Sequence, residues 1–305
     1  MFTLFSTPKP FAGPIDVIQR NAIRSWQRLH TGVEVLLFGD DPGAAEACRD
    51  LGIRHVPNVQ RNPHGTKYLG GIFDQAQEIA AHDVLCYVNC DIILMSDFRR
   101  AVESVSRLHK NFLLAGRRWD VDIRNPLDFQ QIAWEEEVRQ LAFKTNRQRP
   151  AQWMDYFVFG KGLYYQKIPG FVVGRPGWDP WLLWYALHAG VPVVDASAAL
   201  CAVHQNHDYS YHSDGEKGVW EGEEAQENSR LLEDGRKFRT LRDATFVLNK
   251  SGLHRNYARW AARLERGLRG WLSSIWFRLL DATRPVRHKI GLRQKAKNDP
   301  SAAAR

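Results

Sequence analysis

The sequence predicts an α/β fold, a mostly parallel sheet with helices on both faces. Over the first hundred residues, short apolar runs alternate with segments whose apolar residues recur at the period of a helix. Such a βαβ order favours a parallel sheet covered on both sides. The apolar run 84–94 is typical of a buried strand in that kind of sheet. The composition, 44% apolar and 25% charged over 305 residues, is that of a globular chain.

Elements of the first half follow one another in regular order. Residues 15–29 repeat apolar side chains at helical spacing, and the apolar run 33–38 ends in the turn sequence Gly39-Asp40-Asp41-Pro42-Gly43. Gly52 closes the next helical pattern. The predicted strands are 2–6, 33–38, 53–56 and 84–88, and the predicted helices are 15–29, 44–51 and 69–81.

The second half is less regular. The predicted helices are 98–108, 132–143 and 181–189, and the predicted strands are 112–115, 154–159 and 191–194. Residues 215–235 are polar and charged, which is typical of loop and exposed helix. A long helical pattern follows over 253–280, and the basic sequence beyond it predicts disorder.

The positive charge is concentrated in the C-terminal tail. The chain carries a net +8, but residues 241–305 hold 15 Lys and Arg against 4 Asp and Glu, which leaves 27 against 30 for residues 1–240. A near-neutral main domain argues against nucleic-acid binding, and a basic tail argues for an interacting appendage. We therefore predict a main domain over 1–240, a basic amphipathic helical extension over 241–285 and a disordered basic tail over 286–305.

The cysteines and the N-terminus indicate the compartment. The four cysteines show no paired or metal-type spacing, so we interpret them as reduced core thiols of a cytosolic protein. The first residues have the pattern of a strand and not of a signal peptide. No stretch of eighteen uncharged apolar residues occurs, so we expect no membrane span.

One carboxylate, Asp91, stands between two apolar runs and carries the first functional signal. Burying an unpaired carboxylate costs several kcal/mol. Asp91 should therefore lie where the strand leaves the sheet, facing a metal ion, a basic partner or water. The carboxyl ends of parallel strands are also where open α/β sheets bind ligands.

The segment Asn89-Cys90-Asp91 resembles the Asp-x-Asp signature of GT-A-type nucleotide-sugar-dependent glycosyltransferases, and the likeness covers residues 1 to about 210. In that family the carboxylates of the signature hold a divalent cation, Mn²⁺ or Mg²⁺, on the diphosphate of the sugar nucleotide. The resemblance implies Asp91 as a metal ligand. Asn89 replaces the first Asp of the signature, although an amide oxygen can still ligate a cation or hydrogen-bond a ribose.

Further positions match the family in order along the chain. Thr7 and Pro8 follow the first strand, where the resemblance implies a loop that holds the nucleotide. Asp40 ends the second strand and corresponds to an acidic residue that contacts the base or ribose, although Gly-Asp after a strand is more often a simple turn. Gly65 and Thr66 stand where a small residue lets the backbone approach the nucleotide.

Two arginines, Arg117 and Arg118, directly follow the predicted strand 112–115. Guanidinium groups match phosphate oxygens, so the pair would clamp a diphosphate even without a metal ion. The alternative is a set of surface salt bridges with Asp120 and Asp122.

A carboxylate at a predicted helix start, Asp179, lies between Trp178 and Trp181. Inverting members of the family carry a catalytic Asp or Glu in this region, commonly in a Glu-Asp pair whose first position is Trp178 here. The resemblance implies Asp179 as the general base that deprotonates the acceptor hydroxyl. The two tryptophans would stack on the acceptor sugar. The alternative role for Asp179 is a helix N-cap.

The densest polar cluster spans residues 203–209, with His212 beyond it. Metal-dependent members of the family often take a third ligand from a His near the end of the catalytic domain, which implies His204 as a ligand. Because His204 and His207 are three residues apart, we expect only one of them to coordinate. His207 would then contact phosphate or acceptor.

These matches imply a cytosolic glycosyltransferase with a GT-A-like catalytic domain over 1–240. It would move a sugar from a nucleoside diphosphate to a hydroxyl acceptor, with inversion, in cell-surface polysaccharide or glycolipid synthesis. The alternatives are a metal-dependent hydrolase built on Asp91 and residues 204–212, a non-catalytic sugar-binding protein, and a sugar nucleotidyltransferase of the same fold. A nucleotidyltransferase should carry a Gly-rich basic loop after the first strand, which residues 7–11 do not resemble.

The tail predicts a second binding surface. Apolar residues recur there at helical spacing with arginines between them: Trp260, Leu264, Leu268, Trp271, Leu272, Ile275, Trp276 and Leu279, and Arg255, Arg259, Arg263, Arg266 and Arg269. Such a helix suits an anionic membrane surface, which would make the protein peripheral at the inner face of the membrane and its acceptor lipid-linked. The alternative is a helix that packs its apolar side on the main domain.

Overall fold

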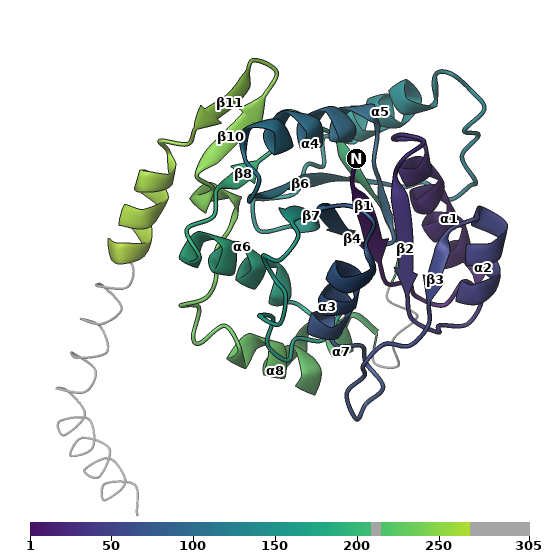
Figure 1. Cartoon of the computed structure of the whole chain (residues 1–305), viewed down its shortest axis with the longest axis horizontal. Coiled ribbons are helices and arrows are strands. Elements are labelled where there is room, and N and C mark those ends of the chain that lie inside the picture. The colour runs from purple at the N-terminus through teal and green to yellow at the C-terminus, as the bar shows by residue number, and fades with distance from the viewer. Residues whose placement is uncertain (209–214, 269–305) are drawn as a thin grey trace, which may run out of the picture. The chain divides into compact units, whose positions relative to one another are not determined.

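A computed structural model of the chain describes residues 1–208 and 215–268. The chain divides into two compact units, Met1–Asn256 and a second that begins at Tyr257. The first unit consists of a twisted sheet with helices packed against both faces (Figure 1). It extends past the predicted boundary at residue 240, because two further strands of the chain pair with the sheet.

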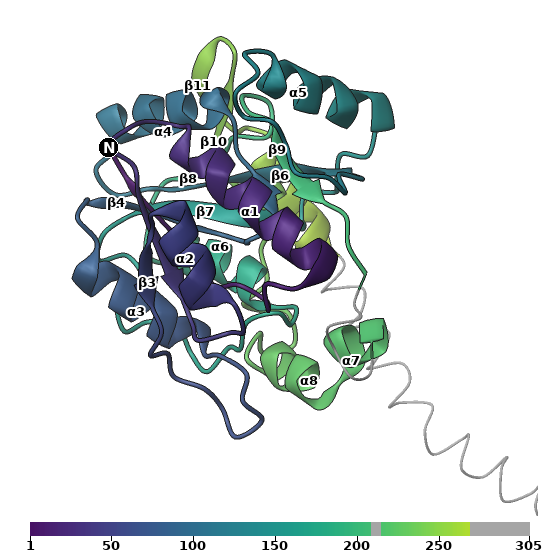
Figure 2. The same ribbon diagram turned by 90° about the vertical axis from the view of Figure 1, so that its right-hand side faces the viewer.

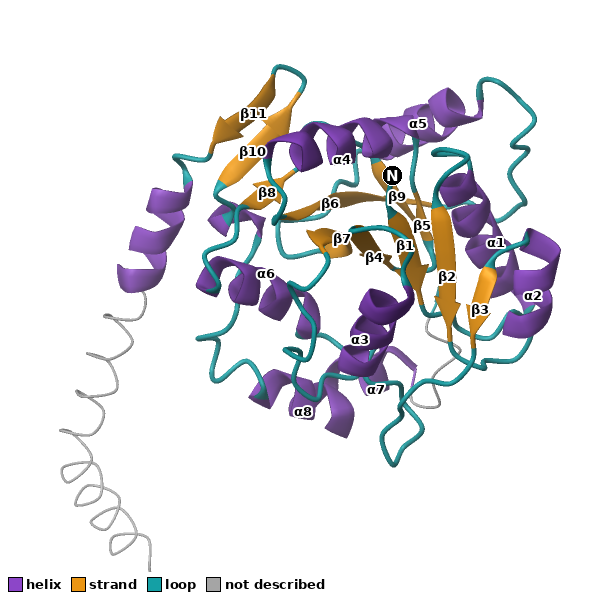
Figure 3. Cartoon of the chain, viewed as in Figure 1, coloured by secondary structure: helices purple, strands orange, loops and turns teal. Residues whose placement is uncertain are grey.

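The sheet of the described residues has eleven strands, and its main path runs β11-β10-β8-β6-β7-β4-β1-β2-β3. The strands are β1 (Thr3–Ser6), β2 (Glu34–Phe38), β3 (Arg54–Val56), β4 (Val84–Val88), β5 (Ile92–Ile93), β6 (Leu113–Val121), β7 (Met154–Gly160), β8 (Val193–Asp195), β9 (Ala202–Gln205), β10 (Phe246–Asn249) and β11 (Gly252–Arg255). The short strand β5 pairs with β9, and β9 also pairs with β6 (Figure 3).

Most neighbouring strands are parallel, as the βαβ order predicts. Strand β1 pairs in parallel with β2 and β4, and β6 pairs in parallel with β8 and β9. Strand β7 is antiparallel to both of its neighbours, β4 and β6. The sheet is therefore mixed, and the strand 154–159 that the sequence predicts sits at its centre with reversed direction.

The helices bury their apolar sides on the two faces of the sheet. They are α1 (Gly13–Gln27), α2 (Ala44–Leu51), α3 (Leu69–Ile79), α4 (Ser96–Leu108), α5 (Trp134–Thr145), α6 (Trp178–His188), α7 (Gly215–Glu221) and α8 (Glu223–Arg230). One core contains Trp26 of α1 and Phe98 of α4, a second contains Phe73 of α3 and Leu182 of α6, and a third contains Trp134 of α5. Figure 2 shows α1 and α4 on one side of the sheet and α3 on the other.

The strand that begins near residue 112 is among the elements that differ from the sequence prediction. The strand predicted over 112–115 continues to Val121, with a register shift between Ala115 and Arg117. Gly116 lies in that shift, where a Cβ atom would meet the Tyr156 hydroxyl at 2.0 Å, so only glycine fits. Mostly polar residues follow Gly116, and they mask the strand pattern in the sequence. The pattern is weak because the two faces of this part of β6 contact different surroundings.

The long helix predicted from residue 253 begins later. Residues 246–255 form the hairpin of β10 and β11, and Gly252 takes a φ of +118°, which favours glycine at the start of the second strand. Helix covers residues 259–268. The predicted positions Arg269, Trp271, Leu272, Ile275, Trp276 and Leu279, and the predicted disordered tail 286–305, lie outside the described residues.

The cysteines agree with the sequence prediction. Cys48, Cys86, Cys90 and Cys201 are buried and free, as predicted for core thiols. Within residues 1–208 and 215–268, no helix is long and apolar enough to cross a membrane.

Candidate active site

A cavity of about 250 Å³ opens at the carboxyl ends of β1 and β4. The loop after β1 contributes Thr7, Pro8 and Lys9, and the turn after β4 contributes Asn89 and Asp91. Further side chains come from the other half of the unit: Arg118, Trp153, Asp155, Trp178, Asp179, His204, His207 and Trp220. The cavity therefore gathers residues that are distant in sequence at the sheet edge where open α/β folds bind ligands.

Strand register brings Asp91 and His204 together. Strand β5 follows Asp91 directly, and its first residue, Ile92, pairs with His204 of β9. Asp120 of β6 pairs with His204 from the other side. The backbone N–H of Gln205 donates to the carbonyl oxygen of Asp91 at 3.1 Å. Two strand pairings thus fix a carboxylate on each side of one imidazole.

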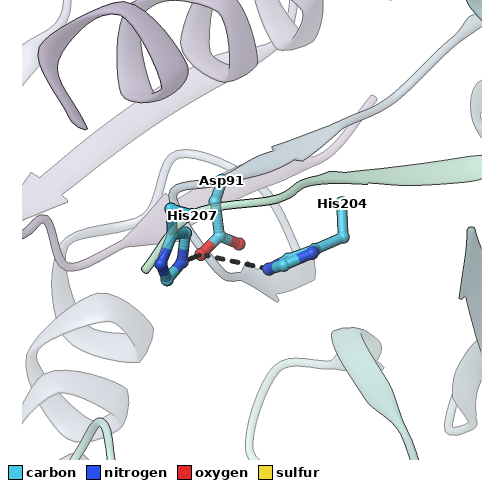
Figure 4. Close-up of side chains that lie close together, drawn as sticks. All are labelled: Asp91, His204 and His207. Atoms are coloured by element: carbon cyan, nitrogen blue, oxygen red, sulfur yellow. Dashed lines mark hydrogen bonds and ion pairs between the residues drawn. The ribbon is translucent and has the colours of Figure 1, made fainter. Parts of the chain in front are cut away.

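Both histidines of the cluster face Asp91, whereas the sequence spacing predicted only one ligand (Figure 4). The Nε2 atoms of His207 and His204 lie 3.2 and 3.8 Å from Asp91 Oδ2. The candidate ligand atoms of the three side chains lie within 4.8 Å of one another. The reason is that β9 ends at Gln205, so strand alternation no longer fixes the side on which His207 lies.

Hydrogen-bond geometry leaves Nε2 of each histidine facing Asp91. His207 Nδ1 lies 2.7 Å from the Asp208 carbonyl oxygen, and because a carbonyl only accepts, Nδ1 carries the proton. His204 Nδ1 faces Asp120 Oδ1 at 3.5 Å. A carboxylate or carbonyl behind the distal ring nitrogen is the usual arrangement of metal-ligating histidines.

The charge environment keeps Asp91 ionised. Burial opposes ionisation, but His204, His207 and Lys9 lower the pKa of Asp91 well below its ordinary value. Its Oδ1 atom is buried and has no hydrogen-bond partner among the described residues. One carboxylate oxygen and two imidazole nitrogens are a donor set that suits transition metals such as Mn²⁺ or Zn²⁺, whereas Mg²⁺ prefers oxygen ligands. The described residues therefore fit a divalent cation, which Asp91, His204 and His207 would hold.

Lys9 also reaches this triad, and the sequence interpretation missed it. Its Nζ lies 2.8 Å from His207 Nε2 and 3.6 Å from Asp91 Oδ2. Burial lowers the pKa of Lys9, and the charge of Asp91 opposes that shift. The available signal was position, because Lys9 follows directly on the predicted nucleotide loop Thr7-Pro8.

The loop that carries Lys9 is fixed on both sides. Gln19 of α1 accepts from the Lys9 N–H at 2.7 Å and donates to the Lys9 carbonyl at 3.0 Å. Lys67 Nζ donates to Thr7 Oγ1 at 2.8 Å and to the Pro8 carbonyl at 2.9 Å. Thr7 and Pro8 line the cavity as predicted, and buried Lys67 is a second basic residue that the sequence interpretation missed.

The other predicted nucleotide contacts lie elsewhere. Asp40 is exposed, forms an ion pair with Arg61 and does not line the cavity, whereas its neighbour Asp41 pairs with Lys67. Gly65 and Thr66 also lie outside the cavity lining. Gly65 has a φ of +83°, so it serves a turn.

The two predicted arginines separate because both lie inside β6. Adjacent strand residues point to opposite faces, so Arg118 lines the active-site cavity while Arg117 lines a different cavity beside Ser197. The two-arginine clamp is therefore wrong. Arg118 is buried and donates to Asp155 Oδ1 at 2.7 Å and to Asp120 Oδ1 at 3.0 Å, and these acids raise its pKa against the effect of burial.

Asn89 is held by a carboxylate and does not join the triad. Its Nδ2 donates to Asp155 Oδ1 at 2.7 Å, and its backbone N–H donates to the Asp155 carbonyl at 2.9 Å. Asp155 had the same sequence signal as Asp91, a lone acid inside an apolar strand. The sequence predicted only a strand over residues 154–159, so Asp155 was given no functional role.

Asp179 lies in the first turn of α6 and lines the cavity. The helix begins at Trp178, and its N-cap is Gly177, with a φ of +112° and no side-chain cap hydrogen bond. The N-cap alternative for Asp179 is therefore wrong. Burial, reinforced by the negative charge of Asp155, raises the pKa of Asp179 to about 7. Such a carboxyl group can accept a proton near neutral pH.

One of the two predicted aromatic residues lines the cavity. Trp178 does so, and it contacts Tyr87 and Phe157 edge-on. Trp181 is only 3% exposed and stacks on Tyr185 within the core, so its predicted contact with an acceptor is wrong. The cavity instead has two other tryptophans, Trp153 and Trp220, whose ring centroids lie 5.4 Å apart.

Comparison with known proteins finds a likeness of structure only. No family model and no curated protein matches the sequence. Glucosyl-3-phosphoglycerate synthase of M. tuberculosis matches at 12% identity and a TM-score of 0.43, over 76% of this chain and 80% of the synthase chain. The same synthase in complex with Mg²⁺ and UDP matches at 12% identity and a TM-score of 0.38, over 68% of this chain and 72% of that chain.

A third solved structure is the mannosyltransferase PcManGT from Pyrobaculum calidifontis in complex with GDP-Man and Mn²⁺. It matches at 11% identity and a TM-score of 0.44, over 69% of this chain and 59% of that chain. Each of these solved structures matches this chain with a TM-score below 0.5. At these identities and TM-scores no site residue is transferred from them.

Proposed function

We propose that this chain is a cation-dependent glycosyltransferase that moves a sugar from a nucleoside diphosphate to a hydroxyl acceptor with inversion. The observation that carries the proposal is that one cavity holds both a cation-type triad, Asp91, His204 and His207, and a carboxyl group of raised pKa, Asp179. Group transfer from a diphosphate needs both parts. The negative charge of the leaving group must be stabilised, and the attacking hydroxyl must lose a proton.

The chain's own residues have distinct roles in this proposal. Asp91, His204 and His207 would hold the cation, which supplies positive charge to the diphosphate when bound. Thr7 and its fixed loop would position the nucleotide. Asp179, in its ionised form, would take the proton of the acceptor hydroxyl as the sugar is transferred.

The cavity's aromatic residues support a saccharide acceptor. Trp153, Trp178 and Trp220 line the same cavity as Asp179. Tryptophan faces and edges give sugar rings an apolar contact surface, while neighbouring carboxylates accept from hydroxyl groups. The fixed loop Thr7-Pro8-Lys9 is not the glycine-rich loop expected of the nucleotidyltransferase alternative.

Ligand-dependent thermal unfolding tests the proposal. The full chain is titrated with UDP and GDP, each with and without Mn²⁺. A glycosyltransferase of this kind should be stabilised by one of the two diphosphates, and more strongly with Mn²⁺. Asp91→Asn should lose the part of this stabilisation that depends on Mn²⁺. Asp122→Asn is the matched control, because Asp122 is an exposed carboxylate that contacts Arg147 and Asn206 outside the cavity, and the amide can still accept from Asn206.

The outcomes separate the alternatives. A hydrolase built on the same triad should show a shift with Mn²⁺ alone and none with either diphosphate. A sugar-binding protein should respond to free saccharides and ignore nucleotides. Product analysis then decides the reaction: transfer releases a nucleoside diphosphate from the donor, whereas a nucleotidyltransferase releases pyrophosphate from a nucleoside triphosphate.

We further propose that the basic tail binds an anionic membrane surface and that the acceptor is lipid-linked. Within helix 259–268, Trp260, Leu264 and Leu268 recur four residues apart and are 59%, 68% and 59% exposed. Arg259 and Arg263 approach the Trp260 ring at 5.9 and 5.2 Å. A helix with exposed apolar and basic residues of this kind suits a lipid headgroup boundary, where each Arg contributes about 1 kcal/mol.

Sedimentation with liposomes tests the tail. The full chain should sediment with vesicles that contain phosphatidylserine at low salt and be released at high salt. A chain truncated after Asn256 should stay in the supernatant. That end point keeps the β10–β11 hairpin, which a truncation near residue 250 would cut. Equal sedimentation of both chains contradicts the proposal.

A further inference from the structure

The ammonium group of Lys9 lies where the metal-type triad converges. Its Nζ is 2.8 Å from His207 Nε2 and 3.6 Å from Asp91 Oδ2. These two atoms are also candidate ligands of a divalent cation. The chain thus brings a cation of its own to two of the three groups that would hold the metal.

A metal ion and Lys9 cannot both use His207. Because His207 Nδ1–H donates to the Asp208 carbonyl, Nε2 has the only ring lone pair. An ammonium group donates and cannot accept, so at 2.8 Å that lone pair accepts from Lys9. Coordination of a metal requires the same lone pair. Binding of the cation through His207 must therefore break the contact with Lys9.

Only the side chain of Lys9 can move easily. Its backbone N–H and carbonyl are both held by Gln19, at 2.7 and 3.0 Å, and the preceding carbonyl of Pro8 accepts from Lys67 at 2.9 Å. The side chain of Lys9 is 27% exposed and lines the active-site cavity. A displaced ammonium group therefore stays in the cavity, one side-chain length from a fixed Cα.

We propose that Lys9 is a resident cation of the site, displaced from His207 and Asp91 by a divalent cation and then paired with the diphosphate of the donor. This inference rests on the proposed function. Lys9 opposes the cation when it binds alone, since two positive charges would compete for the same carboxylate. Lys9 favours binding of the cation together with a diphosphate, because the negative charge of the diphosphate attracts both the cation and Lys9. Lys9 is thus a diphosphate-binding residue that couples metal binding to donor binding.

Mn²⁺ binding measured by electron paramagnetic resonance tests the inference in the full chain. Lys9→Met should bind Mn²⁺ alone at least about fivefold more tightly than the natural chain, because the competing charge is gone. Lys9→Arg keeps a positive charge and should stay near the natural affinity. Lys161→Met is the matched control: Lys161 donates to the Ala80 carbonyl, outside the cavity, and its loss changes the net charge equally.

The second measurement is diphosphate affinity at saturating Mn²⁺, with UDP and GDP as probes in parallel titrations. Lys9→Met should bind the better of the two at least about fivefold more weakly than the natural chain and Lys161→Met. Opposite changes in the two affinities within one variant are the expected signature. A purely structural role for Lys9 would weaken both.

Three results would overturn the inference. In the first, Lys9→Met binds Mn²⁺ as the natural chain does or more weakly, while Asp91→Asn abolishes Mn²⁺ binding. This result contradicts competition between Lys9 and the cation but agrees with the proposed function. Diphosphate binding that needs no Mn²⁺ and is lost in Lys9→Met makes Lys9 the permanent substitute for a metal. Absence of Mn²⁺ and diphosphate binding in the natural chain, Lys9→Met and Lys161→Met alike overturns the proposed function together with the inference.

Discussion

Asp91 and Asp179 are carboxylates that line one cavity, yet their surroundings move their pKa values in opposite directions. Asp91, after β4, is buried among His204, His207 and Lys9, and its interactions with these groups outweigh burial and lower its pKa. Asp179, in the first turn of α6, is buried near Asp155, and its pKa rises to about 7. The same residue type is thus prepared for two tasks, a permanent negative charge and a proton acceptor.

The difference arises from what each backbone element brings beside the carboxylate. The β5–β9 pairing places imidazoles next to Asp91, so burial there is compensated by charge. No ion pair between Asp179 and a basic side chain occurs within residues 1–208 and 215–268. Arg118 is close enough to lower the pKa of Asp179 slightly, but its guanidinium is already bound to Asp155 and Asp120. A carboxyl pair with separated pKa values is a frequent sign of divided catalytic roles.

The largest expected effect is the loss of Asp91. Asp91→Ala should lower kcat/KM for sugar transfer by at least about 10⁴-fold, since a metal ion contributes several kcal/mol to stabilising a leaving diphosphate. Asp122→Ala should leave it unchanged. Initial-rate kinetics at several Mn²⁺ concentrations check this, and activity of Asp91→Ala within a few-fold of the natural chain contradicts the metal site.

Substitution of Asp179 should act on rate and spare donor binding. Asp179→Asn keeps the size of the side chain but cannot accept a proton, so kcat should fall by about 10²- to 10⁴-fold while diphosphate affinity at saturating Mn²⁺ stays the same. Comparing kcat with the diphosphate affinity from calorimetric titration distinguishes an effect on rate from an effect on donor binding. A parallel loss of affinity would assign Asp179 to donor binding.

The pH dependence should identify Asp179 as the group of raised pKa. Its base form is the ionised one, so kcat/KM should fall about tenfold per pH unit below about 7 and level off above it. Rates are measured from pH 5 to 9 at saturating Mn²⁺, with Asp122→Asn as the control. A profile that stays flat down to pH 5 would exclude a base with this pKa.

The smallest effect concerns stability. The folded-state pKa of Asp179 is above its unfolded value, so its contribution to stability is present below about pH 4 and lost as pH rises through about 7. Asp179→Asn removes the buried charge and should raise the free energy of unfolding at pH 8 by about 1 to 4 kcal/mol. Urea unfolding at pH 8 and pH 4 checks this, and an equal effect at both pH values contradicts the assignment.

The sequence predicted the elements well where apolar period and length agree. The strand 84–88 and the helix 44–51 have the predicted bounds, because each combines a clear pattern with a turn at its end. The continuation of β6 and the β10–β11 hairpin were missed. In both, charged or polar residues stand among the apolar ones, and only the neighbouring strands supply the pairing that makes them strands.

The candidate site was predicted unevenly for a similar reason. Asp91 has a local signal, because it is an acid between two apolar runs. His204 also has one, because it belongs to a histidine cluster. The structure brings the two residues together. Lys9 and Asp155 had local signals that were not used, and Lys67 became visible only through contacts that join distant segments. Arg117 and Trp181 had the right residue type but point away from the cavity, which depends on strand and helix direction.

The two-residue strand β5 also has a consequence for how the chain is made. Asp91 and His207 are separated by 116 residues, and their contact depends on the pairing of β5 with β9. During synthesis on the ribosome, Asp91 therefore emerges long before the histidines that complete the triad. A bound ion would stabilise only chains in which this long loop has closed. The time at which a refolding chain takes up Mn²⁺ would then report when β9 docks on β5.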